Sequence, residues 1–392
     1  MRSIGVTCRA SLAAALFVFA QFEIGAAYAI PPDDVAESEI RNARPGGIIR
    51  IWPLEGGSDF GAKAYRVLYR STGLNGEPIP VTAAIIFPDG PAPAGGRPVV
   101  AWAHPTTGIA TRCAPTLLPG VQVQGIDEML RRGYVITATD YPGLGTAGIH
   151  PYLIGDSEAY SVLDSVRAAR ELPDAKAQKR FAVWGHSQGG HAALFTGQLA
   201  ASYAPDLELV GVAAAAPATY LADLFEADRH TQSGLTLTAM ALLSWSKLYH
   251  LPTQNIVDSG ALAAYERVAS DCLENLSQML RLAQDARPLM QGFLKTDPAR
   301  IPQWRELMDR NTPGQVPPGA PVFIAQGTAD ATVPPPVTRR FAQHLCKEGA
   351  AVTFRSYPGT SHIFIARDSS FDAVTWISHR FAGMTAASNC SH

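Results

Sequence analysis

A serine at position 187 stands between two glycines in a run whose residue types suit nucleophilic chemistry. Residues 181–190 read FAVWGHSQGG, an apolar stretch that leads into the motif GHSQG and then into a helix-like sequence. A G-x-S-x-G motif between a strand and a helix predicts a sharp turn that exposes the serine hydroxyl. The glycines are needed because a Cβ at either place would collide with the neighbouring strand or helix. The backbone N–H of Gln188 would then point at the carbonyl under attack.

A serine hydroxyl is a poor nucleophile at neutral pH, so it needs a base and an acid that orients the base. In α/β enzymes with such a turn, the acid and then the histidine follow the serine along the chain. Asp330 ends the strand-like run 321–330 and lies too early to cap the next helix. His362 comes just after the strand-like run 351–359. We therefore predict a catalytic triad of Ser187, Asp330 and His362.

Other acids and histidines fit these roles less well. Asp140 also ends a strand, in TATDYPGLG, but it precedes the serine, so we expect it to shape the turn. We expect His104 to hold its own loop. The other histidines flank the serine motif, or lie in predicted helices, in an inserted segment or at the C-terminus: His186, His191, His230, His250, His344, His379 and His392.

A tetrahedral intermediate also needs hydrogen-bond donors for its oxyanion. The Gln188 N–H is predicted to be the first donor. The second normally comes from the loop after an early strand, which here reads HPTTG over residues 104–108. Pro105 has no N–H, so Thr106 is predicted to be the second donor, and Thr107 is the alternative.

The elements that must position these residues alternate between strands and helices. Strand-like runs lie at 64–72, 79–87, 98–105, 134–141, 180–187, 207–218, 321–330 and 351–359, and helix-like runs follow the serine and lie at 157–172, 337–349 and 370–384. Nearly all-apolar strands in such alternation indicate a buried, mostly parallel sheet with helices on both faces. Together with the serine motif, this pattern predicts an α/β-hydrolase fold.

Residues 219–312 interrupt the alternation with helical stretches at 235–250 and 261–284 and no convincing strand. We expect a helical cap inserted between an N-terminal core part (30–218) and a C-terminal core part (313–392). It would lie over the carboxyl ends of the strands, where open α/β sheets bind ligands. The stretch LTLTAMALLSWSKLYH is apolar on more than one face. A lid that opens at a lipid surface is one explanation, and packing of the cap onto the sheet is the other.

The N-terminus has the pattern of a secretory signal. Arg2 and Arg9 precede the apolar run SLAAALFVFA, and Ala27-Tyr28-Ala29 fits a cleavage site. We expect a signal peptide over residues 1–29 and a secreted or periplasmic protein, and a retained anchor is the alternative. The net charge of −2 supplies no basic field for binding nucleic acid.

Removal of such a signal leaves four cysteines in the mature chain: Cys113, Cys272, Cys346 and Cys390. An even number in an exported chain favours two disulfides, and three pairings are open. Free buried thiols are the alternative. The cysteine spacing matches no zinc site, and the predicted chemistry needs no metal or cofactor.

The motifs GHSQGG, DYPGLG, HPTTG followed by CAP, QGTADATVP and YPGTSH, with a helical insertion between, resemble the secretory lipase family of α/β-hydrolases. The resemblance covers essentially the whole mature chain. It implies an acyl hydrolase with Ser187 as nucleophile, Asp330 as acid and His362 as base. It also implies the disulfides Cys113–Cys272 and Cys346–Cys390.

We therefore predict a secreted serine carboxylic-ester hydrolase, a lipase or an esterase, that acts on small-molecule or lipid esters through an acyl-enzyme. The alternative on the same fold is a serine aminopeptidase or acylpeptidase, which would need an acidic pair in the cap to hold the substrate amine. The cap offers scattered acids: Glu226, Asp228, Glu266 and Glu274. A binding protein that has lost catalysis is disfavoured, because all three triad residue types are present.

Overall fold

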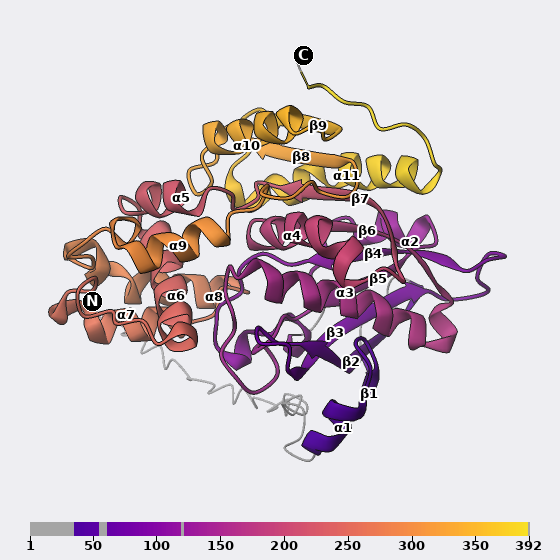
Figure 1. Ribbon diagram of the computed structural model, residues 1–392, viewed down its shortest axis with the longest axis horizontal. Coiled ribbons are helices and arrows are strands. Elements are labelled where there is room, and N and C mark those ends of the chain that lie inside the picture. The colour runs from indigo at the N-terminus through magenta and orange to yellow at the C-terminus, as the bar shows by residue number, and fades with distance from the viewer. Residues whose placement is uncertain (1–34, 55–60, 119–120, 391–392) are drawn as a thin grey trace, which may run out of the picture.

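The computed structural model describes residues 35–54, 61–118 and 121–390 (Figure 1). The signal peptide expected over residues 1–29 lies outside them. Within the described residues, one nine-stranded sheet has the order β1-β2-β3-β5-β4-β6-β7-β8-β9. Its strands are β1 (Ile48–Pro53), β2 (Ala62–Thr72), β3 (Pro78–Pro88), β4 (Arg97–Ala103), β5 (Val135–Thr139), β6 (Ala177–His186), β7 (Glu208–Ala215), β8 (Val322–Gly327) and β9 (Val352–Tyr357).

The sheet is antiparallel at one end and parallel over the rest. β1, β2, β3 and β5 pair antiparallel in turn, and every pair from β5 and β4 through to β9 is parallel. The all-buried strands β5 and β8 explain why the central sheet could be predicted from apolar runs. The edge strand β1 escaped prediction because none of its residues is fully buried.

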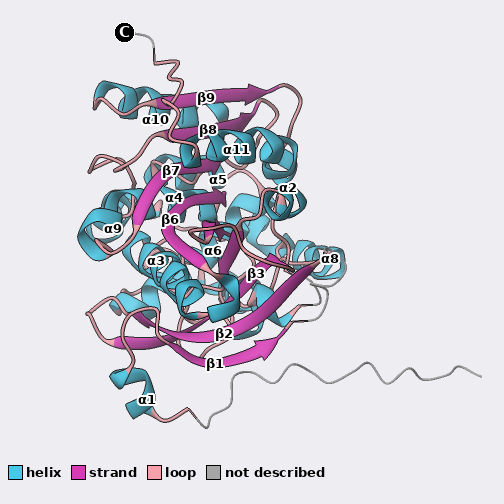
Figure 2. Cartoon of the chain, turned by 90° about the vertical axis from the view of Figure 1, so that its right-hand side faces the viewer, coloured by secondary structure: helices cyan, strands magenta, loops and turns pink. Residues whose placement is uncertain are grey.

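Helices cover both faces of the sheet (Figure 2). One core cluster joins the sheet to α3, α4 and α10, and the other joins it to α2, α11 and the inserted helices. The helices outside the insertion are α1 (Glu37–Asn42), α2 (Ile126–Arg131), α3 (Gly155–Glu171), α4 (Gln188–Tyr203), α10 (Pro335–Lys347) and α11 (Ile365–Phe381). Short 3-10 helices are η2 (Thr111–Cys113), η3 (Pro115–Leu117), η4 (Pro173–Ala175), η5 (Ser259–Ala261), η6 (Arg287–Gln291), η7 (Pro298–Arg300) and η8 (His362–Phe364).

The segment between β7 and β8 is helical and gathers at one end of the molecule, on the left of Figure 1. Its helices are α5 (Leu221–Asp228), α6 (Gln232–Tyr249), α7 (Leu262–Ala269), α8 (Leu276–Asp285) and α9 (Pro302–Arg310). Its only described strand-like pairing is one bridge between Val257 and Leu294. The single helical stretch expected over 261–284 is wrong, because the chain leaves the helix between α7 and α8. Most of α6 is buried, which favours packing as the reason for its apolar faces.

Two disulfides link distant parts of the chain, Cys113 to Cys272 and Cys346 to Cys390. This is the pairing that the family resemblance implies. The first bond joins η2 to the loop between α7 and α8, and the second joins α10 to the C-terminal tail. Among the described residues, no helix is both long enough and apolar enough to cross a membrane.

Candidate active site

Ser187 lies at the turn between β6 and α4. Its φ of 57° and ψ of −117° are a strained combination for a residue with a side chain. Neighbouring elements approach closely: a Cβ on Gly189 would overlap the carbonyl of Ala103 on β4, and one on Gly185 would overlap the backbone of Gly189. The two glycines therefore let the strand, the turn and the helix pack at the distance that exposes the serine.

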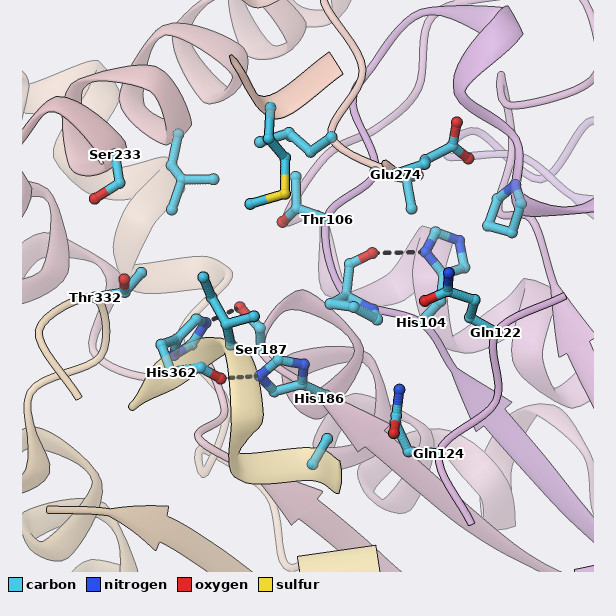
Figure 3. A pocket seen from close by; sticks show the side chains of 18 of the residues that line it. His104, Thr106, Gln122, Gln124, His186, Ser187, Ser233, Glu274, Thr332 and His362 are labelled. Atoms are coloured by element: carbon cyan, nitrogen blue, oxygen red, sulfur yellow. Dashed lines mark hydrogen bonds between the residues drawn. The ribbon is translucent and has the colours of Figure 1, made fainter. Parts of the chain in front are cut away.

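His362 contacts both Ser187 and Asp330, and Figure 3 shows it beside Ser187. Its Nε2 is 2.9 Å from Ser187 Oγ, and its Nδ1 is 2.8 Å from Asp330 Oδ2. The three residues come from the β6–α4 turn, the loop after β8 and the start of η8, so strands far apart in sequence bring them together. A histidine in this position can take a proton from the hydroxyl while the carboxylate fixes its tautomer.

Asp330 is also held in place by donors other than the histidine. Its Oδ1 accepts hydrogen bonds from the backbone N–H groups of Thr332 (2.9 Å) and Val333 (2.8 Å). Its Oδ2 accepts from the Gln326 amide at 3.2 Å, and its side chain is fully buried. These bonds fix the position of the Asp330 carboxylate.

The two expected oxyanion donors are Gln188, which follows Ser187 in the chain, and Thr106, which lines the cavity at Ser187. Gln188 is the first residue of α4, so its N–H has no carbonyl partner inside the helix. Thr106 lines the same cavity as Ser187 and His362, and its Oγ1 lies 2.9 Å from the Tyr152 hydroxyl. Thr107, the alternative, uses its carbonyl to accept the N–H of Leu273 from the inserted segment.

Asp140 has the structural surroundings expected for an acid outside the triad. It is fully buried and accepts hydrogen bonds from the hydroxyls of Thr82 (2.6 Å) and Thr116, and from the Thr116 N–H at 3.0 Å. Burial raises the pKa of Asp140 to about 6, although these hydrogen bonds oppose the shift. His104 bonds the Pro105 carbonyl at 2.7 Å, and burial lowers the pKa of His104 to about 4.

His186 has a specific contact that sequence reasoning missed. Its Nε2 lies 3.0 Å from the carbonyl oxygen of His362, and the two rings are 4.9 Å apart. Burial lowers the pKa of His186 to about 3, so the ring is neutral and donates to that carbonyl. His186 therefore holds the backbone of His362. Its place next to Ser187 in the sequence is the one signal that could have indicated this role.

A cavity of about 610 Å³ opens onto Ser187 and His362. Figure 3 shows Thr106, Ser233 and Thr332 around it, and the inserted helices α6 and α8 contribute further walls, including Leu237 and Leu282. A second cavity of about 30 Å³ also reaches Ser187 and has mostly apolar walls.

The acids of the inserted segment lie in separate places. Asp228 lines the smaller cavity, Glu274 lines the larger one, and Glu226 pairs with Arg229 on the surface. Burial raises the pKa values of Asp228 and Glu274 to about 7. An acidic pair that could hold a substrate amine is not formed by these residues, which removes the support for an aminopeptidase. In the part of the chain that the structure describes, no cluster of three or more His, Cys, Asp or Glu could hold a metal.

The sheet order, the strand–turn–helix at Ser187 and the helical insertion define an α/β-hydrolase. The chain belongs to the secretory lipase family, which it matches over residues 111–389. It is accordingly a carboxylic-ester hydrolase.

Several known proteins and solved structures are similar to this chain over most of their own length. A Mycobacterium tuberculosis protein named "Probable inactive lipase" is 25% identical over 384 residues, which cover 90% of this chain and 83% of that protein. Lipase A of Arthroderma benhamiae is 24% identical over 392 residues, covering 92% and 80%. The closed state of Candida antarctica lipase A has the same fold, with a TM-score of 0.76 at 20% identity, covering 90% of this chain and 86% of that structure.

Proposed function

We propose that the chain is a secreted serine esterase or lipase that works through an acyl-enzyme formed on Ser187. The observation that carries the proposal is the ring of His362, which contacts Ser187 Oγ on one side and Asp330 on the other. Since one relative is named inactive, family membership alone is a weaker basis than this geometry.

The proposed reaction follows from the positions of these groups. His362 Nε2 takes the hydroxyl proton as Ser187 Oγ bonds to the ester carbonyl carbon, and Asp330 stabilises the imidazolium that forms. The N–H groups of Gln188 and Thr106 donate to the oxyanion. The tetrahedral intermediate collapses, the leaving alkoxide takes the proton from His362, and the acyl group stays on Ser187. A water molecule, which gives its proton to His362, then attacks the carbonyl carbon of the acyl-enzyme. The second tetrahedral intermediate collapses, Ser187 Oγ takes the proton back from His362, and the carboxylic acid is released.

We propose an apolar ester as the substrate, with transient contact between the cavity rim and a lipid surface. Two apolar side chains that line the cavity, Met279 and Ile363, are 38% and 63% exposed. Next to them in sequence, Leu280 and Phe364 are exposed as well. Exposed apolar side chains around a cavity mouth are typical of a surface that meets an apolar partner.

We propose export because the chain has two disulfides, which persist in oxidising compartments, and because it belongs to a family of secretory lipases. The expected signal peptide is consistent with this location.

The proposal is tested by replacing the nucleophile. Ser187→Ala should lower kcat on p-nitrophenyl butyrate by about 10⁴-fold, because oxyanion donors and binding alone leave only residual catalysis. A fluorophosphonate should label the wild type and not the variant. Ser233→Ala, which changes another cavity serine, should stay within about threefold of wild type. Folded Ser187→Ala that keeps a tenth of the activity would contradict the assignment.

A series of p-nitrophenyl esters with acyl chains of two to sixteen carbons tests the substrate class. For an apolar-ester hydrolase with a surface-active rim, rates should rise with acyl length and rise again when the ester forms micelles. Leu280→Ser should reduce only the rise at the micelle surface. A preference for acetyl esters without any surface effect would contradict the proposed substrate.

A further inference from the structure

Glu158 and His191 form a buried pair outside the triad. Glu158 lies on α3 and His191 on α4, one helical turn after Ser187. Both side chains are fully buried, and Glu158 Oε2 is 2.7 Å from His191 Nδ1. The backbone N–H of His191 donates to the Ser187 carbonyl at 3.0 Å, so the pair lies directly behind the nucleophile turn.

The partners of the pair indicate where its hydrogens lie. His191 Nε2 lies 2.7 Å from the Asn311 carbonyl oxygen, which only accepts, so Nε2 must carry a hydrogen. A second proton must lie between His191 Nδ1 and Glu158 Oε2, which are 2.7 Å apart. The other oxygen of Glu158 accepts from the Leu153 N–H (3.2 Å) and from the Gln188 amide (2.8 Å). Both oxygens of the Glu158 carboxyl and both ring nitrogens of His191 are therefore held by hydrogen bonds.

Gln188 connects this pair to the reaction. Its side-chain amide donates one hydrogen to Glu158 Oε1 and the other to His150 Nε2, at 3.0 Å. His150 is able to accept because burial lowers its pKa to about 3 and its Nδ1 donates to the Pro142 carbonyl at 2.9 Å. Both hydrogens of the amide are thus used, and the residue that offers the proposed oxyanion N–H is held at its side chain.

Asn311 connects the pair to the end of the inserted helical segment. It is the residue that follows α9, and its Oδ1 accepts the Gly155 N–H at the start of α3, at 3.0 Å. The His191 ring therefore forms hydrogen bonds to Glu158 on α3 and to the backbone carbonyl of Asn311, where the inserted segment ends. One buried pair joins the nucleophile turn, the helix behind it and the inserted segment.

We propose that Glu158 and His191 are positioning residues that hold Gln188 so that its backbone N–H meets the oxyanion. This rests on the proposed function of Ser187 and Gln188. The pair does not touch the substrate, so its loss should lower kcat and leave KM nearly unchanged.

Two substitutions at position 158 separate positioning from charge. In Glu158→Gln, the amide oxygen still accepts from Leu153 and Gln188, and the amide nitrogen donates to a neutral His191. This variant should keep kcat within about threefold, since every hydrogen bond is retained. Glu158→Ala removes the acceptor for Gln188 and should lower kcat by about 10- to 100-fold, less than removal of an oxyanion donor, which costs about 10²–10³-fold.

Asp164→Ala is the matched control. Asp164 is a fully buried acid on the same helix that pairs with Arg167, away from the nucleophile turn. The Asp164→Ala substitution should lower the melting temperature and leave kcat of the folded protein unchanged. Folded Glu158→Ala with wild-type kcat, or equal losses in Glu158→Gln and Glu158→Ala, would overturn the positioning role.

Nitrogen-15 NMR of histidine-labelled wild-type protein provides a test that needs no destabilised variant. His191 should carry a hydrogen on Nε2 in the wild type and in Glu158→Gln, because the Asn311 carbonyl accepts from it in both. A His191 without a hydrogen on Nε2 would overturn the contacts on which the positioning role rests. Fluorophosphonate labelling separates the two proposals: an unlabelled wild type rejects the function of Ser187, whereas a labelled wild type with unaffected Glu158→Ala rejects only the pair.

Discussion

Two buried aspartates show that the partners of a residue decide its role. Asp330 and Asp140 both follow strands of the sheet, and both accept several hydrogen bonds. Asp330 contacts His362, whereas Asp140 contacts the hydroxyls of Thr82 and Thr116. The same side-chain chemistry therefore contacts the proposed base in one place and binds two threonine hydroxyls in the other.

This difference predicts unequal effects of removing the charge. Asp330→Asn should lower kcat by about 10⁴-fold, because asparagine favours the wrong tautomer of His362. Asp140→Asn should change kcat by less than about tenfold, since the threonine hydroxyls can rotate to suit an amide. Steady-state kinetics on both folded variants measures the ratio. Greater sensitivity at Asp140 would move the acid to the earlier strand.

The residues proposed for catalysis could be predicted because each one follows a recognisable strand in a known order. Ser187 has a motif, and Asp330 and His362 stand at the ends of apolar runs. Glu158 and His191 have no such signal. They meet only because α3 packs on α4, and pattern alone does not say which polar residues face each other across two helices.

At the scale of elements, the inserted segment departs most from expectation. Apolar periodicity continues from 261 to 284, so the sequence predicts one helix. The chain instead leaves the helix near Cys272, which is bonded to Cys113, and Leu273 donates its N–H to the Thr107 carbonyl. Asn275 then caps α8 by accepting the Gln278 N–H. Tertiary bonds override the local pattern there, and local reasoning does not detect them.

Asp228, at the end of α5, should make the stability of the folded protein depend on pH. Burial raises the pKa of Asp228 from 3.8 to about 7. Between these values the unfolded chain loses its proton before the folded chain does, so stability falls as pH rises. Asp228→Asn removes this slope. The variant should gain stability relative to wild type between pH 4 and pH 8, by on the order of 3 kcal/mol.

Denaturant unfolding at both pH values measures this gain. Asp206→Asn is the control of opposite sign, because a hydrogen bond from Arg167 lowers the pKa of the Asp206 carboxyl. Removing that carboxyl should lower stability more at pH 8 than at pH 4. A stability difference between Asp228→Asn and wild type that does not vary with pH would show that Asp228 is solvated in the folded protein.

At the scale of the whole molecule, the sequence predicts the order of strands and helices. It does not predict the contacts between segments that lie far apart in the chain. Apolar strands in alternation with helices predict a parallel sheet covered on both faces, and the structure has one. The antiparallel edge at β1 and the separate cavities at Ser187 depend on packing between distant segments. The disulfides could be paired only through the resemblance to a family, since four cysteines allow three pairings.

The two disulfides hold different parts of the molecule, so their loss should have different effects. Cys113–Cys272 lies beside the contact between Thr107 and Leu273, so it joins the loop of Thr106 to the wall of the larger cavity. Cys346–Cys390 holds a tail that also pairs with β9 through Asn389. The closed loops span 159 and 44 residues, which correspond to at most about 5 and 4 kcal/mol in the chain-entropy model.

We therefore expect different outcomes when each pair is changed to serine. Loss of Cys113–Cys272 should lower stability and also change the preference for acyl chain length, because the cavity wall is released from the loop of Thr106. Loss of Cys346–Cys390 should lower the melting temperature and leave kcat and KM unchanged, since its tail lies away from Ser187. Thermal melts and the p-nitrophenyl ester series, measured on both double variants, check the contrast. An unchanged chain-length profile without the first bond would mean that the hydrogen bond from Leu273 to Thr107 and the packing around it hold the wall by themselves.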